Sequence, residues 1–424
     1  MSTAAVLSLQ PVEAPNGDNP FLRVAGLPLI TRQLLGLSQG GVEKIWLVPG
    51  PHSEKVRALI ESDERLGKLS LEITEGSPKE VSAKALAAAS SSADRVLFIE
   101  GPLAFGTGLV RHLATAPLPA EGLRYSAETE FFALPSKAVS SAAPLAAAAK
   151  AQVLVAEKRP EAKDAFLLPV RSRSEARSAK LAIFRTLTKP TSGWVSKNVN
   201  SKISLPISWI VSESPITPNM LTAFATFVGA LSFTFLSRGD QWGVFWGGFC
   251  FQLASALDRC DGEIARCKFK ASPYGEWIDT LGDNLTYTLF VAGLTEGMYA
   301  RTQALWTRWV GYGLLLCVFL VLGLMYSYLL RNTKSGSLVA VYKDMEARYE
   351  GREKPLAYRL LDKIRFMGKR DFFSLTTFVV CALNGLEFLF WAAAFTITCM
   401  LVYVISGRMS LPTGQAEGAP ATSK

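Results

Sequence analysis

The sequence predicts two fold classes in one chain, an α/β domain followed by an all-α domain of six transmembrane helices. Up to about Asn200, short apolar runs alternate with charged, helix-forming segments, as in a water-soluble α/β domain. From about Ser214 onward there are long apolar stretches rich in Phe, Trp, Leu and Gly, which are long enough to cross a bilayer. Four aspartates lie among these stretches, between Asp258 and Asp283. Ionisable residues in such a place indicate a functional site.

The amino-terminal region has the alternation of a parallel-sheet α/β domain. Three short apolar runs predict strands, at Ala4–Leu7, Lys44–Val48 and Arg95–Ile99. Helical patterns fall between and beside them, at Thr31–Leu37, Ser53–Leu66 and Val81–Ser90. A further helix is expected at 171–185, where basic residues recur. It could lie on anionic lipid head groups or simply face solvent.

The carboxy-terminal half contains six candidate membrane spans. They are Pro218–Ser237, Gln241–Leu257, Trp277–Tyr299, Leu305–Leu330, Phe372–Phe388 and Leu389–Ile405. The predicted organisation is therefore an α/β domain at 1–185, a juxtamembrane linker with an amphipathic helix at 186–216, a membrane domain at 217–408 and a disordered tail at 409–424.

The distribution of basic residues predicts how the chain is oriented in the membrane. The net charge is +9, and the loop at 266–270 and the stretch at 331–370 carry most of the basic residues near the spans. Six spans place both loops on the same side, which the positive-inside rule identifies as cytosolic. No signal peptide is visible in 1–19. We expect a multi-pass protein of the cell inner (cytoplasmic) membrane, with its α/β domain and aspartates in the cytosol, a bilayer as partner and no nucleic acid.

The four aspartates belong to a spaced pattern, D-x2-D-G-x2-A-R-x8-G-x3-D-x3-D. On helices, Asp258 and Asp261 are separated by about 60° and Asp279 and Asp283 by about 40°, so each pair projects from one face. A hairpin through Tyr274-Gly275 would set the two pairs opposite each other. Converging carboxylates need cations, and all-oxygen ligation suits Mg²⁺ or Mn²⁺. Two such ions would stabilise charge on a diphosphate.

This pattern, matched at all eight positions, resembles the signature of the CDP-alcohol phosphatidyltransferase family of membrane enzymes. The resemblance implies that Asp258, Asp261 and Asp279 hold two divalent cations, that Asp283 also belongs to the metal site, and that Asp283 is the general base on an acceptor hydroxyl. It also implies a pocket for the cytidine and phosphates, lined by Gly262, Ala265, Arg266 and Gly275. The segment Thr217–Thr222 looks like the start of the family's first membrane helix.

The amino-terminal half looks like a Rossmann-like sugar-phosphate nucleotidyltransferase domain. In particular, it is similar to the cytidylyltransferase half of bifunctional enzymes that make CDP-inositol and then di-inositol phosphate. Three departures predict a degenerate domain with a structural, docking or regulatory role. Prolines in Ser8–Pro15 replace a Gly-rich phosphate loop, Asn19-Pro20 replaces a lysine, and Glu100-Gly101-Pro102 replaces a metal-binding aspartate.

The predicted function is therefore phosphotransfer at a membrane. The enzyme would move a phospho-alcohol group from CDP-inositol or CDP-diacylglycerol to an alcohol such as inositol phosphate and release CMP. The product would be a phospholipid or an inositol phosphodiester. Candidate residues for binding the acceptor phosphate are Lys197, Lys268, Lys369 and Arg370. The alternative is a catalytically silent membrane scaffold or CDP-alcohol receptor, and the family resemblance also suggests a homodimer.

Overall fold

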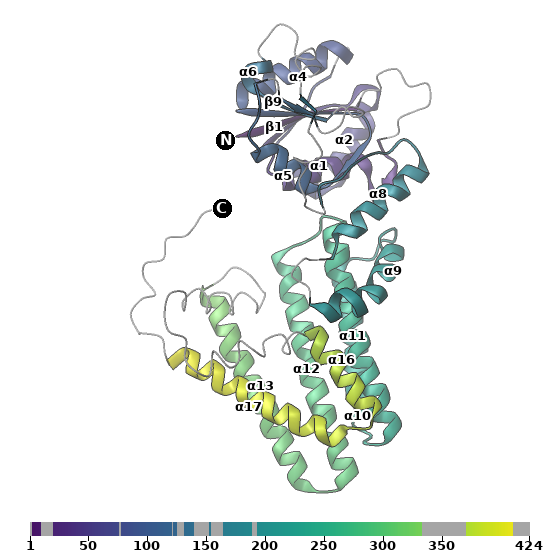
Figure 1. The fold of residues 1–424 in the computed structure, drawn as a ribbon, viewed down its shortest axis with the longest axis vertical. Coiled ribbons are helices and arrows are strands. Elements are labelled where there is room, and N and C mark those ends of the chain that lie inside the picture. Colours follow the sequence, from purple (N-terminus) through teal and green to yellow (C-terminus); the bar gives the residue numbers. More distant parts are fainter. Residues whose placement is uncertain are drawn as a thin grey trace. The chain divides into compact units, whose positions relative to one another are not determined.

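The computed structural model describes residues 2–9, 20–75, 78–120, 122–124, 131–139, 152–153, 164–188, 193–332 and 370–409. The chain divides into two compact units (Figure 1). Met1–Leu187 together with Cys267–Phe269 form one, which we call the α/β unit. Thr188–Arg266 together with Lys270–Lys424 form the other, the helical unit.

The α/β unit is built on a seven-stranded sheet with the order β10-β8-β9-β6-β1-β4-β5. The three predicted strands are confirmed as β1, β4 and β6, and β1 pairs in parallel with both of the others. The sheet is mixed, because β9 runs antiparallel to β6 and to β8. The strands are β1 Thr3–Ser8, β4 Lys44–Val48, β5 Leu71–Ile73, β6 Arg95–Glu100, β8 Leu123–Arg124, β9 Phe131–Pro135 and β10 Gln152–Val153.

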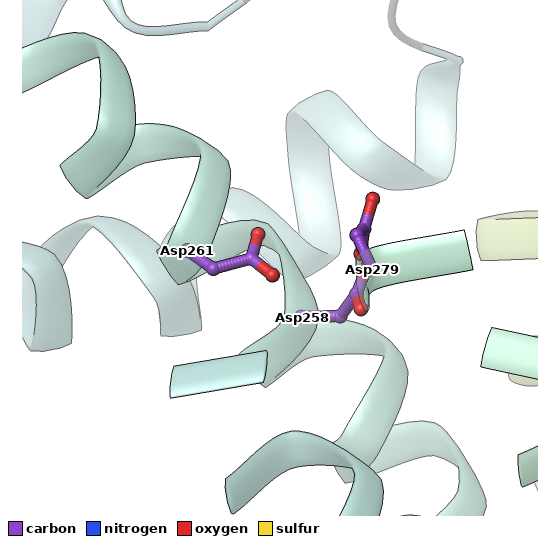
Figure 2. A group of neighbouring side chains, drawn as sticks. All are labelled: Asp258, Asp261 and Asp279. Atoms are coloured by element: carbon purple, nitrogen blue, oxygen red, sulfur yellow. The ribbon is translucent and has the colours of Figure 1, made fainter. Parts of the chain in front are cut away.

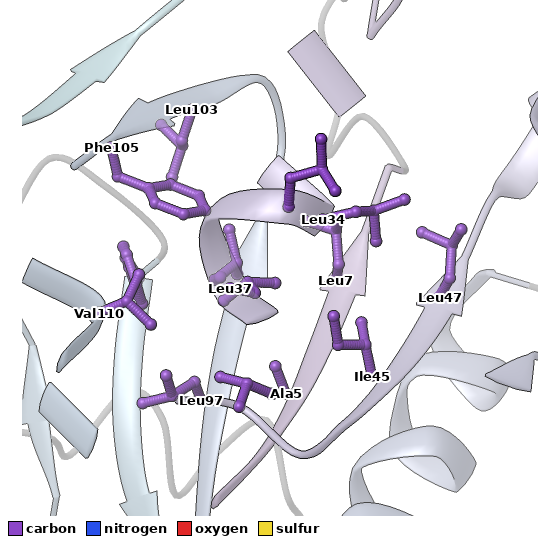
Figure 3. Close-up of a cluster of buried hydrophobic side chains, with 14 of the residues drawn as sticks. Ala5, Leu7, Leu34, Leu37, Ile45, Leu47, Leu97, Leu103, Phe105 and Val110 are labelled. Carbon is purple, nitrogen blue, oxygen red and sulfur yellow. The ribbon is translucent and has the colours of Figure 1, made fainter. Parts of the chain in front are cut away.

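Successive side chains of a strand point to opposite faces of the sheet, so a strand of apolar residues makes both faces apolar. Helices cover both faces of this sheet. Ala5 and Leu7 of β1 point into a core shared with α1 (Leu29–Gln39) and α5 (Thr107–Thr115), which Figure 3 shows. Ala4 and Val6 point into the opposite core, shared with α4 (Pro78–Ser92) and α6 (Ser136–Val139). Buried on both faces, β1 reads as a continuous apolar run, as central parallel strands do.

Two predicted helices of this unit differ in detail from the structure. The helix expected at 53–66 is divided into α2 (Ser53–Ser62) and α3 (Glu64–Gly67), because Asp63 is extended and its carboxylate caps α3. The basic helix is α8 (Arg173–Thr186), which begins at a capping box. Its apolar face is buried, including Phe184, and it packs on β2 (Arg23–Val24) and β11 (Leu167–Pro169) within this unit. That packing favours the solvated-face interpretation of its basic residues over the membrane-surface one.

The helical unit begins with a short π-helix, η3 (Ser196–Asn200), and α9 (Ser201–Val211). Among the residues that the structure describes, six helices follow at positions close to the predicted spans. They are α10 Pro218–Leu236, α11 Gln241–Cys267, α12 Pro273–Thr302, α13 Leu305–Asn332, α16 Arg370–Ala382 and α17 Leu386–Met409.

Three of the described helices, α10, α13 and α17, are long and apolar enough to cross a membrane, so a count of six spans does not follow from length and composition. The sequence predicts that the last two spans meet near a turn at Leu386-Glu387, and the structure places the break between these helices at 383–385, so the predicted limits of the spans shift by a few residues. Asn384 adopts a left-handed conformation with φ of 60°, which ends α16, and α17 therefore begins at Leu386.

Small residues bring α10 and α12 close together, and α11 packs on both. A side chain at Gly229 of α10 would collide with Thr286 of α12, and one at Gly282 of α12 would collide with Thr226 of α10. Close backbone approach through small residues is typical of membrane helices. Phe251 of α11 packs on Phe290 of α12 with ring centroids 4.2 Å apart. This packing places the aspartate-bearing parts of α11 and α12 beside each other.

Candidate active site

The two helices that carry the aspartates are joined by a short turn. Asp258 and Asp261 lie in the last turns of α11, which ends at Cys267. The next helix, α12, begins at Pro273, and Ser272 caps it by accepting a hydrogen bond from the Gly275 N–H. The prediction that the chain turns through Tyr274-Gly275 is therefore wrong. Both residues are helical, because a proline suits the first position of a helix, and the turn falls at 268–272.

Three carboxylates converge between these helices. Asp258, Asp261 and Asp279 each offer an oxygen, and these three atoms all lie within 4.8 Å of one another (Figure 2). Asp261 is buried and the other two are half-buried. Asp279 Oδ1 is buried without a hydrogen-bond donor among the described residues. A cluster that offers only oxygen acceptors, one of them unsatisfied, fits a hard divalent cation.

Asp261 is held in place from a third helix. Thr222 Oγ1 of α10 donates a hydrogen bond of 2.5 Å to Asp261 Oδ2, and the Gly262 N–H donates to Asp261 Oδ1. As predicted, a helix starts at Thr217–Thr222, with Thr217 as its cap and Pro218 in its first turn. The segment therefore both starts α10 and orients one of the clustered carboxylates.

Asp283 lies outside the group of three and shares an arginine with it. Arg370, the first residue of α16, places Nη1 2.6 Å from Asp258 Oδ2 and also pairs with Asp283 Oδ1. Its side chain is 21% exposed, so this ion pair is partly shielded from solvent. The sequence predicted a phosphate-binding role for Arg370, whereas the structure shows its contacts with two of the aspartates.

The small residues of the pattern lie near these groups. A Cβ atom on Gly262 would come within 3.2 Å of Arg266 Nη1, so the absent side chain leaves room for the guanidinium. At Gly275 a Cβ atom would come within 3.3 Å of the Ser272 hydroxyl and 3.7 Å of Asn219 Oδ1. Ala265 is half-buried on α11, one turn beyond Asp261.

The other three predicted phosphate-binding residues are lysines. Lys197 is exposed on η3, and Lys268 is buried and grouped with the α/β unit. Lys369 lies outside the described residues. For Arg370, in contrast, the structure describes ion pairs with Asp258 and Asp283.

Sequence reasoning missed a set of buried polar residues beside the cluster. Glu263, two residues after Asp261, is completely buried, and Asn200 of η3 is buried as well. A signal was present in the sequence, because polar residues recur at every fourth position, at 196, 200, 204 and 208, and the stretch is otherwise apolar from Ile203 onward. Helical residues at this spacing share one face.

Comparison with known proteins identifies the helical unit. Residues 215–404 match the model of the CDP-alcohol phosphatidyltransferase family. The helical part of this chain is therefore similar to that family over the matched residues, which make up less than half of the chain. The matched region contains α10 to α16 and most of α17, and therefore all four aspartates and Arg370. This family match and the three apolar helices together indicate a membrane protein.

Curated relatives extend the similarity. The chain is 26% identical over 242 residues to the bifunctional IPC transferase and DIPP synthase of Archaeoglobus fulgidus, covering 56% of this chain and 43% of that protein. The Aquifex aeolicus protein of the same name is 26% identical over 208 residues, covering 49% and 42%. The phosphatidylinositol phosphate synthase of Mycobacteroides abscessus is 28% identical over 104 residues, covering 24% and 46%. The chain thus spans less than half the length of each of these relatives.

Proposed function

We propose that this protein transfers a phospho-alcohol group from a CDP-linked alcohol to the hydroxyl of a second alcohol and releases CMP. The observation that carries the proposal is the convergence of Asp258, Asp261 and Asp279, with Asp283 joined to them through Arg370. It supports phosphotransfer because the same residues fall within the region that matches a family of such transferases. In a reaction of this type, catalysis consists mostly of positioning and charge neutralisation.

The residues take separate roles in this mechanism. Asp258, Asp261 and Asp279 would hold two Mg²⁺ or Mn²⁺ ions, which when bound neutralise charge on the donor diphosphate. Asp283 would take the proton from the acceptor hydroxyl, whose oxygen then bonds to the phosphorus of the alcohol phosphate while the bond to CMP breaks. Arg370 would favour the ionised form of the Asp283 carboxylate, which a general base requires.

The pattern residues would bind the donor. Gly262 and Gly275 would let the nucleotide approach the backbone closely once it binds, and Ala265 has a side chain small enough to allow the same approach. Arg266 would contribute a planar pair of donors to a phosphate. Beyond Arg370, we propose Lys197, Lys268 and Lys369 as contacts for an acceptor phosphate.

The substrates proposed are CDP-inositol or CDP-diacylglycerol as donor and an alcohol such as inositol phosphate as acceptor. Relatives named as DIPP synthases and as a phosphatidylinositol phosphate synthase support a product that contains inositol phosphate. We further propose a homodimer in the cell inner membrane, with the site facing the cytosol. The basic loops at 266–270 and 331–370 support that orientation.

For the α/β unit we propose a structural, docking or regulatory role. Ser8 and Glu100 lie opposite each other at the carboxyl ends of β1 and β6, where a nucleotide would bind in an open α/β sheet. Glu100 is followed by Gly101, which adopts φ of 84°, and by Pro102, in place of a metal-binding aspartate. We expect Asp279→Asn protein, incubated with CTP and inositol 1-phosphate, to release no pyrophosphate. Release above background would show that this unit retains cytidylyltransferase activity.

The proposed function is tested with detergent-purified protein and Mg²⁺. CDP-inositol and CDP-diacylglycerol are each combined with inositol, inositol 1-phosphate and glycerol 3-phosphate, and CMP release is followed. We expect release with at least one pair, and none in EDTA or in the Asp279→Asn variant. Binding of a CDP-alcohol without CMP release for any pair would instead indicate a receptor.

A further inference from the structure

A buried polar stripe runs along the segment that precedes the first long helix. We use this name for Ser196, Asn200, Ser204 and Ser208, which follow one another at four-residue intervals through η3 and α9. Each is at most 2% exposed. On its other side α9 exposes apolar residues, with Ile210 74% exposed. The segment therefore buries polar groups and exposes apolar ones, the reverse of a water-soluble helix.

The serines of the stripe bind a buried charge pair on α11. Glu263, with no exposed surface, accepts hydrogen bonds from Ser204 Oγ at 2.8 Å and from Ser208 Oγ at 2.7 Å. Arg259, one helical turn earlier, lies 3.3 Å from Glu263 Oε1. The Arg259 guanidinium also donates to the hydroxyls of Ser196 and Ser204. Both Glu263 carboxylate oxygens and three guanidinium nitrogens are thus engaged.

Asn200 extends these contacts to a second helix. Its side-chain oxygen accepts from Gln252 Nε2 of α11 at 2.9 Å, and its Nδ2 donates to Asp371 Oδ1 at 2.8 Å. Asp371 directly follows Arg370, which pairs with Asp258 and Asp283. The stripe therefore contacts both the helix of the first two aspartates and the start of the helix that supplies their arginine.

The position of these contacts on α11 matters for the aspartates. Asp258, Arg259, Asp261 and Glu263 all lie within two turns of α11. Arg259 directly follows Asp258 and is rotated from it by about 100° around the helix. The face that docks on the stripe is thus rigidly connected to the face that carries the carboxylates. A buried charge is costly unless every hydrogen bond is made, so such a network favours one arrangement of its helices.

We propose that the polar stripe is a positioning element of the active site, an inference that rests on the proposed function. By fixing the rotation of α11 and the start of α16, it sets Asp258, Asp261 and Arg370 at the distances that metal and substrate require. Ile207 of α9 already packs in two apolar clusters, so apolar contacts are available to attach this helix. The buried charge pair adds orientation, since displacement by about 1 Å can cost 10²-fold in rate.

The double variant Ser204→Ala/Ser208→Ala tests this role, and Ser212→Ala is the matched control. Ser212 is equally buried and lies four residues further along, but its hydroxyl bonds within its own helix, to the Trp209 carbonyl. We expect the double variant to lose about 10- to 100-fold in kcat and to bind Mn²⁺ more weakly by electron paramagnetic resonance. The control should change neither. Equal Mn²⁺ affinity and equal kcat in both variants would overturn the proposal.

A second variant separates positioning from folding. Arg259→Met/Glu263→Met removes both charges together, which commonly leaves stability unchanged or raised. If its melting temperature matches the wild type while kcat and Mn²⁺ affinity fall, the network positions the site. If all three match the wild type, the network is dispensable and the proposal is wrong. Mn²⁺ affinity is measured without substrate. The positioning role can therefore be tested even if the proposed function fails and no donor and acceptor pair yields CMP.

Discussion

The two ends of α12 carry acidic residues that differ in how far the protein neutralises their charge. Near the carboxyl end, Glu296 accepts hydrogen bonds from Arg308 at 2.6 Å and from the Tyr312 hydroxyl at 2.7 Å. Near the amino end, Asp279 and Asp283 join two more aspartates, and Arg370 is the cation that the described residues pair with them. At the carboxyl end the negative charge of Glu296 is neutralised by Arg308, whereas the aspartates at the amino end keep an excess of negative charge over the cation paired with them.

This difference separates an architectural ion pair from a site. Arg308 also lies over the Tyr299 ring, 3.7 Å from its centroid, so Glu296 and its partners form a self-contained group. At the other end a buried oxygen of Asp279 has no donor among the described residues. Buried polar groups are normally satisfied, and an unsatisfied carboxylate oxygen within a group of converging carboxylates fits a bound cation. Acidic residues in these helices therefore indicate function only where the protein does not neutralise their charge with its own cations.

Removing a metal ligand should have the largest effect. We expect Asp279→Asn to lower CMP release by more than about 10³-fold, because a bound ion contributes several kcal/mol to stabilising the transition state. Glu296→Gln, the matched change at the other end of α12, should leave the rate within about twofold, as substitutions away from the site do. The assay is CMP release at saturating substrate. A large loss in Glu296→Gln would mean that the two ends do not differ in this way.

Removing the proposed base should rank second. Asp283→Asn keeps the shape of the side chain and removes its ability to take a proton, so kcat should fall by about 10²- to 10⁴-fold. Binding of the CDP-alcohol, measured by titration calorimetry, should be retained because Asp283 lies outside the group of three. A variant that kept most of its rate would show that another group takes the proton.

Replacing the arginine should have an intermediate effect. Arg370→Gln removes the proposed charge-assisted contact with the acceptor phosphate, worth about 1.5–3 kcal/mol, and we expect the KM for a phosphorylated acceptor to rise about tenfold or more. The control is Arg308→Gln, whose arginine pairs only with its local group in the described contacts. Steady-state kinetics with varied acceptor measure the effect, and equal KM values in the two variants would exclude a special role for Arg370.

The smallest effect should come from breaking the ion pair between Glu296 and Arg308 at the carboxyl end of α12, and it concerns thermal stability. Glu296 and Arg308 are partly exposed, with side-chain exposures of 22% and 37%. Such a pair contributes about 0–1 kcal/mol, so Glu296→Gln should lower the melting temperature by at most about 4 °C. Thermal unfolding in detergent measures this. A collapse of stability would show that this pair holds α12 and α13 together.

Local patterns predicted much of the fold. The strands at 4–7, 44–48 and 95–99 were found because strands buried on both faces are continuous apolar runs. Other features depend on details that periodicity does not carry. The division of a predicted helix at Asp63 follows from one extended residue, and the start of α17 at Leu386 follows from the left-handed Asn384. Neither conformation alters the hydrophobic pattern.

By itself, the sequence determined which aspartates pair along each helix, because spacings of three and four residues place side chains on one face whatever the helix packs against. Only the tertiary structure decided that α11 and α12 set three of these carboxylates within 4.8 Å. It also decided that Arg370 of α16 reaches Asp258 and Asp283, and that Glu263 lies against the serines of α9. The physical reason is that such contacts join residues far apart in the chain, and helix packing, not local periodicity, selects them.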